Sequence, residues 1–215
     1  VLHGAYDSKE GKLGVYSALC ASGVGVVIPD AALHGERSVA GLTPQEMGER
    51  NFVWTAAART SHGMAALISA LQETFGPLPL WAVGSSMGGY TAQFLALTEP
   101  RVSRVACLIS AGVWQDPAVT APEALEYLGR FRPVQHAALA PPTRLLLQNG
   151  SDDPLFGPEA VGETARAYRR AYQEAGCPQH FTARAYPGVA HSTSVPMRDE
   201  AVAFVLEGLA TGRVA

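Results

Sequence analysis

Residues 84–88 read Gly-Ser-Ser-Met-Gly, and this short run places a serine where it could act as a nucleophile. The central Ser86 has glycine two positions before it and two positions after it, as a nucleophile elbow between a strand and a helix requires. The elbow is a strained turn that lifts the hydroxyl above a sheet, so a Cβ on either flanking residue would collide with its neighbours. Ser85 fails the test because Val83 lies two positions before it. The motif therefore predicts Ser86 as the nucleophile of an acyl-transfer reaction.

A serine hydroxyl is a weak nucleophile at neutral pH, so a histidine must accept its proton. When the serine lies on such an elbow, the chain order is serine, then acid, then histidine. His136, His180 and His191 follow Ser86 in the sequence. Only His191 lies in a loop between a late strand-like run, Phe181–Tyr186, and the final helix-like segment. We therefore expect His191 to be the general base.

The carboxylate that orients this histidine is expected at residues 150–154, which read Gly-Ser-Asp-Asp-Pro. This segment follows the strand-like run Thr143–Leu147, so both acids leave the sheet at its edge. We favour Asp153, because Asp152 is better suited to cap the turn or to face solvent. The residues alone leave both aspartates open.

Apolar strand-like runs alternate with longer helix-like segments, and this alternation predicts a parallel sheet covered on both faces by helices. The predicted strands are Val1–Leu2, Val24–Pro29, Leu80–Val83, Val102–Ile109, Thr143–Leu147 and Phe181–Tyr186. The predicted helices cover residues 8–22, 52–75, 89–97, 159–174 and 198–209. Residues 1–215 are expected to form a single α/β domain, with a small helical cap inserted at about residues 113–141.

Composition narrows the possible functions. Charged residues make up 16% of the chain and the formal net charge is −3, without a basic stripe, so no nucleic-acid partner is predicted. Three widely spaced cysteines favour a reducing, cytoplasmic location over a disulfide framework. No apolar run is long enough to predict a membrane span, and no histidine or cysteine spacing predicts a metal site. The chain begins at Val1, so a leader or earlier strands stay open as an alternative.

The motifs together resemble the α/β-hydrolase superfamily, from His3-Gly4 through the elbow and the acid loop to His191. Within it, the sequence is most similar to small bacterial serine esterases related to dienelactone hydrolases and to the peptidase domain of the prolyl oligopeptidase group. In those proteins the acid commonly lies three residues after a glycine, which matches Gly150 and Asp153. Dienelactone hydrolases have a cysteine where this chain has Ser86, so their own activity is not implied.

Two backbone amides are expected to form an oxyanion hole. Met87 lies at the start of the helix after the serine, where unpaired amides and the positive end of the helix favour a developing negative charge. The resemblance implies that the loop after His3-Gly4 supplies the second amide, from Ala5, with Tyr6 as the neighbouring choice.

The sequence thus predicts a serine hydrolase that cleaves carboxylic esters of small to medium acyl groups through an acyl-enzyme intermediate, with no cofactor. The expected partner is a small-molecule ester, and the oligomeric state is not predicted. Candidate substrate-binding residues are Tyr6, Trp114, Tyr127 and Phe131, although packing of the insert on the core explains the last three equally well. Two alternatives stay open: a peptidase or thioesterase with the same three residues, and a hydrolase-like binding protein without turnover.

Overall fold

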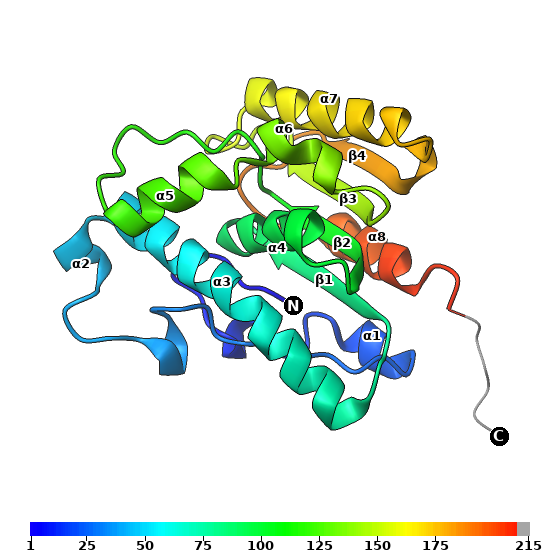
Figure 1. Ribbon diagram of the computed structural model, residues 1–215, viewed down its shortest axis with the longest axis horizontal. Helices are drawn as coiled ribbons and strands as arrows, with labels where there is room; N and C mark the ends of the chain where they lie inside the picture. The colour runs from blue at the N-terminus through cyan, green and yellow to red at the C-terminus, as the bar shows by residue number, and fades with distance from the viewer. Residues whose placement is uncertain (210–215) are drawn as a thin grey trace.

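The computed structural model describes residues 1–209 and is built around a parallel sheet of four strands (Figure 1). The strands are β1 (Leu80–Ser85), β2 (Val102–Leu108), β3 (Arg144–Gly150) and β4 (Phe181–Tyr186). They lie side by side in chain order, and each neighbouring pair is parallel. All four carboxyl ends therefore meet at one edge of the sheet, which is where α/β proteins commonly place their binding sites.

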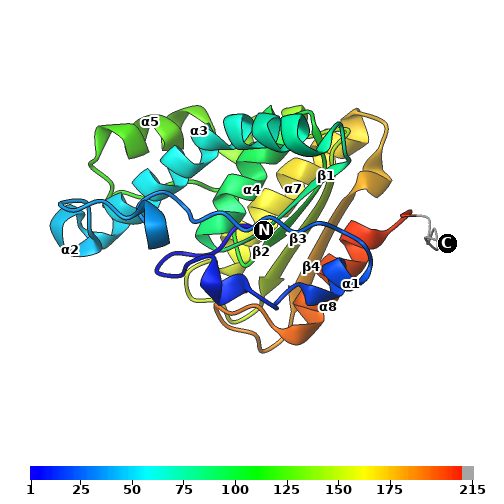
Figure 2. The same ribbon diagram turned by 90° about the horizontal axis from the view of Figure 1, so that it is seen from below.

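Helices cover both faces of this sheet, as the alternating pattern predicts (Figure 2). One face carries α3 (Glu49–Phe75), α4 (Met87–Thr98) and α7 (Pro158–Glu174), and the other carries α1 (Ser17–Ala21) and α8 (Val195–Leu206). Each crossover between neighbouring strands must bridge a parallel pair, so it needs a long connection, and α4 and α7 supply two of them. None of the helices among residues 1–209 is both long and apolar enough to span a bilayer.

The strands are apolar on both sides because both sides are packed. Along β2, Val105 and Cys107 point into the core under α4 and α7, whereas Ala106 and Leu108 point into the core under α8. This is the two-residue alternation of a pleated strand, and all four side chains are fully buried. Burial raises the pKa of the Cys107 thiol, which leaves it an inert core residue.

The segment predicted as a helical insert holds α5 (Pro122–Arg130), α6 (Pro133–His136) and a 3₁₀ turn, η3 (Ala137–Leu139). Proline occupies the first turn of both α-helices, where its missing N–H costs no hydrogen bond. In Figure 1, α5 lies beside the first half of α3, and the two helices are in contact. Aromatic rings fill the space beneath this contact, from α3, α4 and the insert.

The first part of the chain differs from its prediction. The helix expected over residues 8–22 is wrong in its first half, which holds only a 3₁₀ turn, η1 (Glu10–Lys12), before α1. Gly14 lies between the two with a φ of +77°, a left-handed conformation that ends any continuous helix. Three more short helical elements lie between the longer ones: the 3₁₀ turns η2 (Gly35–Arg37) and η4 (Pro178–His180), and the one-turn helix α2 (Pro44–Met47).

The strand expected at Val24–Pro29 is also wrong as a regular strand, since no ladder forms there. The segment runs beside the start of the chain, where the amino group of Val1 donates to the carbonyl oxygen of Val27 at 2.7 Å. Leu2 makes a single parallel bridge with Gly84 of β1. The start of the chain thus lies next to β1, and residues 24–29 lie beside the start of the chain, without either segment completing a ladder.

Candidate active site

The turn from β1 into α4 holds Ser86 in a backbone conformation that few L-residues adopt, with φ 55° and ψ −118°. A Cβ added to Gly84 would lie 2.1 Å from the carbonyl oxygen of Gly88, and one added to Gly88 would lie 2.3 Å from that of Leu2. Backbone contacts therefore require both glycines of the motif. The amide of Ser86 donates to the carbonyl oxygen of Leu108 at 2.9 Å, which ties the turn to the end of β2.

Side chains from three strand ends form one hydrogen-bonded chain. The Oγ of Ser86 lies 2.9 Å from Nε2 of His191, and Nδ1 of His191 lies 2.8 Å from Oδ2 of Asp153. The Asp153 side chain is fully buried, whereas the His191 side chain is 22% exposed. A hydrogen on Nδ1 that is donated to the carboxylate leaves the Nε2 lone pair facing the hydroxyl. The arrangement can therefore move a proton from the serine to the imidazole.

The acid is held in place from both sides of its carboxylate. While Oδ2 faces the histidine, Oδ1 of Asp153 accepts the amide N–H groups of Leu155 at 2.8 Å and Phe156 at 3.1 Å. The neighbouring Asp152 is exposed and accepts a hydrogen bond from the Ser151 hydroxyl at 2.6 Å. Of the two aspartates that the sequence left open, the structure places Asp153 against the histidine.

Two backbone amides border the serine. Met87 begins α4, so its N–H has no partner within the helix. A Cβ added to Gly4 would lie 3.5 Å from the Cβ of the serine, which places the loop after Gly4 against the elbow. Within residues 1–209, neither the Met87 amide nor the Ala5 amide donates a hydrogen bond, whereas the Tyr6 amide is already bonded to an imidazole nitrogen. Of the two choices in this loop, Ala5 therefore has the available N–H.

The four aromatic candidates for substrate binding lie in different surroundings. Trp114 and Tyr127 are buried, with exposed fractions of 1% and 0%, and stack on each other within the aromatic cluster under the insert. Phe131 is half-buried and packs edge-on against Phe94. Tyr6 is 61% exposed beside the elbow. Only Tyr6 of the four is both accessible and adjacent to an amide that borders the serine.

Two apolar residues of the loop after Asp153 are missing from the sequence-based candidates. Phe156 packs its ring 5.5 Å from that of His191, and Leu155 is largely exposed in the same loop. Their positions in the sequence could have identified them, because they follow Asp153 by two and three residues, in a loop already expected to border the site. Together with Tyr6 they give the surroundings of the serine an apolar character.

A hollow of about 350 Å³ lies elsewhere, between the insert and α7. Val113, Arg132 and Arg166 are among the residues that line it, and no member of the hydrogen-bonded chain does. The candidate active site is therefore identified by the hydrogen-bonded side chains of Ser86, His191 and Asp153, and not by this hollow.

Known proteins share this architecture. No curated protein matches the chain. Among solved structures, TT1662 from Thermus thermophilus is 24% identical over 95% of this chain and 85% of that chain, with a TM-score of 0.79. Esterase PE8 is 19% identical over 96% and 89% of the two chains, with a TM-score of 0.65. A zinc-bound cold-adapted esterase from an Arctic intertidal metagenomic library is 18% identical over 95% and 79%, with a TM-score of 0.63. The model of the alpha/beta hydrolase family matches residues 1–211, and the chain belongs to that family.

Proposed function

We propose that the protein is a serine hydrolase that cleaves carboxylic esters of small to medium acyl groups. The observation that carries this proposal is the hydrogen-bonded chain from Ser86 through His191 to the buried Asp153. An alpha/beta hydrolase with esterases among its structural neighbours supports the reaction class. The same three side chains could also cleave thioesters or amides. Which leaving group the protein prefers is therefore a question for experiment.

In the first half of the reaction, the Oγ of Ser86 attacks the carbonyl carbon of the ester while its proton moves to Nε2 of His191. Asp153 stabilises the imidazolium that forms, because its carboxylate accepts the Nδ1–H. The negative charge on the substrate oxygen is stabilised by the amides of Met87 and Ala5. Collapse of this intermediate breaks the bond to the alkoxy oxygen, which leaves as an alcohol with the proton from Nε2.

In the second half, water attacks the acyl-enzyme and gives its proton to Nε2 of His191. The second tetrahedral intermediate collapses, the proton returns to Ser86, and the carboxylic acid is released. No group beyond those of the chain and the water is needed to balance either half. The apolar side chains of Tyr6, Leu155 and Phe156 beside the site favour an uncharged acyl or alcohol group.

A substrate panel tests the proposal. We expect the wild-type protein to hydrolyse p-nitrophenyl acetate, butyrate and octanoate faster than a matched thioester or an aminoacyl p-nitroanilide. Ser86→Ala should lower kcat by about 10³-fold or more, because removal of the nucleophile leaves only the remaining transition-state stabilisation. A fluorophosphonate should label the wild-type protein and leave Ser86→Ala unlabelled.

The alternatives predict different results. Preference for the thioester or the anilide would assign the same residues to a thioesterase or a peptidase. Folded wild-type protein that neither turns over an ester nor takes the label would instead indicate a binding protein, and the proposal would fail.

A further inference from the structure

His34 is a buried histidine outside the hydrogen-bonded chain, and both of its ring nitrogens have backbone partners. Its Nδ1 lies 2.9 Å from the carbonyl oxygen of Ala32, and its Nε2 lies 3.1 Å from the amide nitrogen of Tyr6. A carbonyl only accepts, so Nδ1 carries the hydrogen; an amide only donates, so Nε2 is bare. These partners select one neutral tautomer. The ring packs between those of His3 and Phe52, at centroid distances of 5.4 and 4.9 Å.

The bond from Tyr6 to His34 joins two segments whose backbones are both strained. Tyr6 has a φ of 61°, and Leu33, directly before the histidine, has a φ of 65°. Positive φ is unfavourable for a residue with a Cβ and persists only where the surroundings impose it. Strain of this kind concentrates at functional sites, and here it lies at both ends of a single hydrogen bond.

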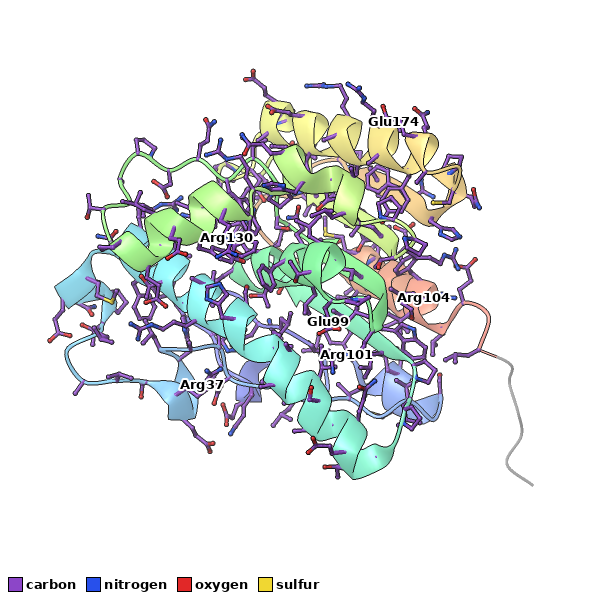
Figure 3. The ribbon with its side chains drawn as sticks, viewed as in Figure 1. Arg37, Glu99, Arg101, Arg104, Arg130 and Glu174 are labelled. Atoms are coloured by element: carbon purple, nitrogen blue, oxygen red, sulfur yellow. The ribbon has the colours of Figure 1, made fainter. Side chains whose placement is uncertain are left out.

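The loop that carries His34 is itself fixed. Both carboxylate oxygens of the buried Asp30 accept backbone amides, from Lys9 at 2.8 Å and Glu36 at 3.0 Å. Arg37, labelled in Figure 3, donates to the carbonyl oxygen of Asp30 at 3.0 Å. A Cβ at Gly35 would lie 2.4 Å from the Asp30 carboxylate, and the φ of +51° at this position also favours glycine, so both observations explain the glycine after the histidine. The imidazole is therefore presented from a rigid support.

The other end of the bond lies next to the serine. Gly4 packs against Ser86, and Ala5, whose amide is available, lies between Gly4 and Tyr6. We propose that His34 is a positioning residue: by accepting the Tyr6 amide it fixes the strained turn that aims the Ala5 amide at the oxyanion. The inference rests on the proposed serine hydrolase function. It gives His34 no contact with the reacting atoms.

The same geometry makes the turn sensitive to acid. A proton on Nε2 of His34 would face the N–H of Tyr6, so protonation must break their bond. Burial lowers the pKa of His34 below its usual value of 6.5, and nearby His3 acts in the same direction. The bond to Ala32 and the carboxylates of Asp30 and Asp7 oppose that shift. The turn is therefore intact at neutral pH and is released in acid.

Four variants test the proposal. His34→Phe keeps a ring but removes the acceptor, and His34→Asn is polar but too short to reach Tyr6. His34→Gln can place an oxygen near the position of Nε2 and does not titrate. His180→Gln is the matched control, because His180 also bonds a backbone carbonyl, that of Pro142 at 3.0 Å, at the opposite end of the sheet.

For His34→Phe and His34→Asn we expect kcat on p-nitrophenyl butyrate to fall by about 10- to 100-fold, somewhat less than the loss of a whole oxyanion donor. KM should change little, since the donor acts on the transition state. His34→Gln should keep most of the wild-type kcat and lose less of it in acid than the wild type does. His180→Gln should match the wild type.

A wild-type kcat in His34→Phe and His34→Asn would overturn the inference, as would a His34→Gln variant no better than His34→Phe, or an equal loss in His180→Gln. A rise in KM at constant kcat would also overturn it. Failure of the inference is separable from failure of the proposed function, because the latter is judged on wild-type turnover and fluorophosphonate labelling alone.

Discussion

Gly150 and Val189 touch through their backbones: a Cβ added to Gly150 would lie 1.9 Å from the carbonyl oxygen of Val189. The same oxygen accepts the amide of Asp152 at 3.1 Å. The loop that carries the acid and the loop that carries the histidine are therefore packed as one unit. This backbone contact holds the two loops at the distance that lets Nδ1 of His191 lie 2.8 Å from Oδ2 of Asp153.

Gly150→Ala should separate the two loops. Because the clash is with backbone rather than with a flexible side chain, we expect it to destabilise the protein by about 1–3 kcal/mol, as overpacking does. Ester turnover should fall by about 100-fold, since small displacements of catalytic groups have effects of that size. Urea unfolding and esterase kinetics measure the two effects. Gly129→Ala in α5 is the matched control: nothing lies within 4 Å of its added Cβ, so stability should not fall. An unchanged Gly150→Ala would contradict the packing argument.

The two adjacent aspartates allow a direct comparison. Asp153→Asn keeps the size of the side chain but removes the charge that orients His191, so kcat should fall by about 10³- to 10⁴-fold. Asp152→Asn should stay close to the wild type, because the Asp152 side chain is exposed and its hydrogen bond is to the neighbouring Ser151 hydroxyl, whereas the bond from its backbone amide to Val189 is kept in the variant. Esterase kinetics on both variants decide the assignment. A larger loss in Asp152→Asn would reverse it.

The sequence predicts that Ser86, His191 and the pair Asp152 and Asp153 lie together, because each follows a strand of one parallel sheet, although this argument does not choose between the two aspartates. Strands are recognisable from apolar runs, and parallel strands bring their carboxyl ends together, so these residues converge without any knowledge of packing. The same reasoning could not place Trp114 and Tyr127, since an aromatic residue in an insert has the same local pattern whether it lines a pocket or fills a core. Only tertiary packing on α3 and α4 buries them.

Contacts between loops that are distant in the sequence leave no pattern in the residues of either loop. The bond from Tyr6 to His34 joins residues 28 positions apart in segments without regular structure. Nothing in either segment predicts that one supplies an amide and the other an imidazole at that place. The failed strand at Val24–Pro29 has a related cause, because an apolar run becomes a strand only where a partner ladder forms beside it.

The strained serine predicts a conflict between stability and function. With φ at 55° and ψ at −118°, position 86 suits glycine far better than any residue with a Cβ. Ser86→Gly should therefore be more stable than Ser86→Ala by about 1 kcal/mol, after allowance for the greater freedom of glycine in the unfolded chain. Both variants should be inactive. Thermal and urea unfolding of the pair measure the difference, and equal stabilities would show that the turn is not strained.

An ion pair at the far end of α4 gives a pH dependence that is separate from the active site. Glu99 is buried, and its two carboxylate oxygens accept hydrogen bonds from Nε and Nη2 of Arg101, at 2.7 and 2.6 Å. Both residues are labelled in Figure 3. Arg101 also donates to the Ser69 hydroxyl at 2.9 Å, so the pair ties α3 to the end of α4 and the start of β2. The hydrogen bonds from Arg101 hold the pKa of Glu99 below its usual value of 4.5, against the effect of burial.

A lowered pKa in the folded state means that the unfolded chain binds the proton more readily. The stabilisation from Glu99 is thus fully present above about pH 4.5 and is lost as the pH falls through the lower, folded-state pKa. In urea unfolding across this range, Glu99→Gln should show a shallower decline of stability in acid than the wild type, with esterase activity at neutral pH unchanged. Glu174→Gln is the control, because Glu174 pairs with Arg170 on an exposed face of α7, where an ion pair contributes little. If the decline in Glu99→Gln is as steep as in the wild type, other carboxylates govern the acid stability and the buried pair does not.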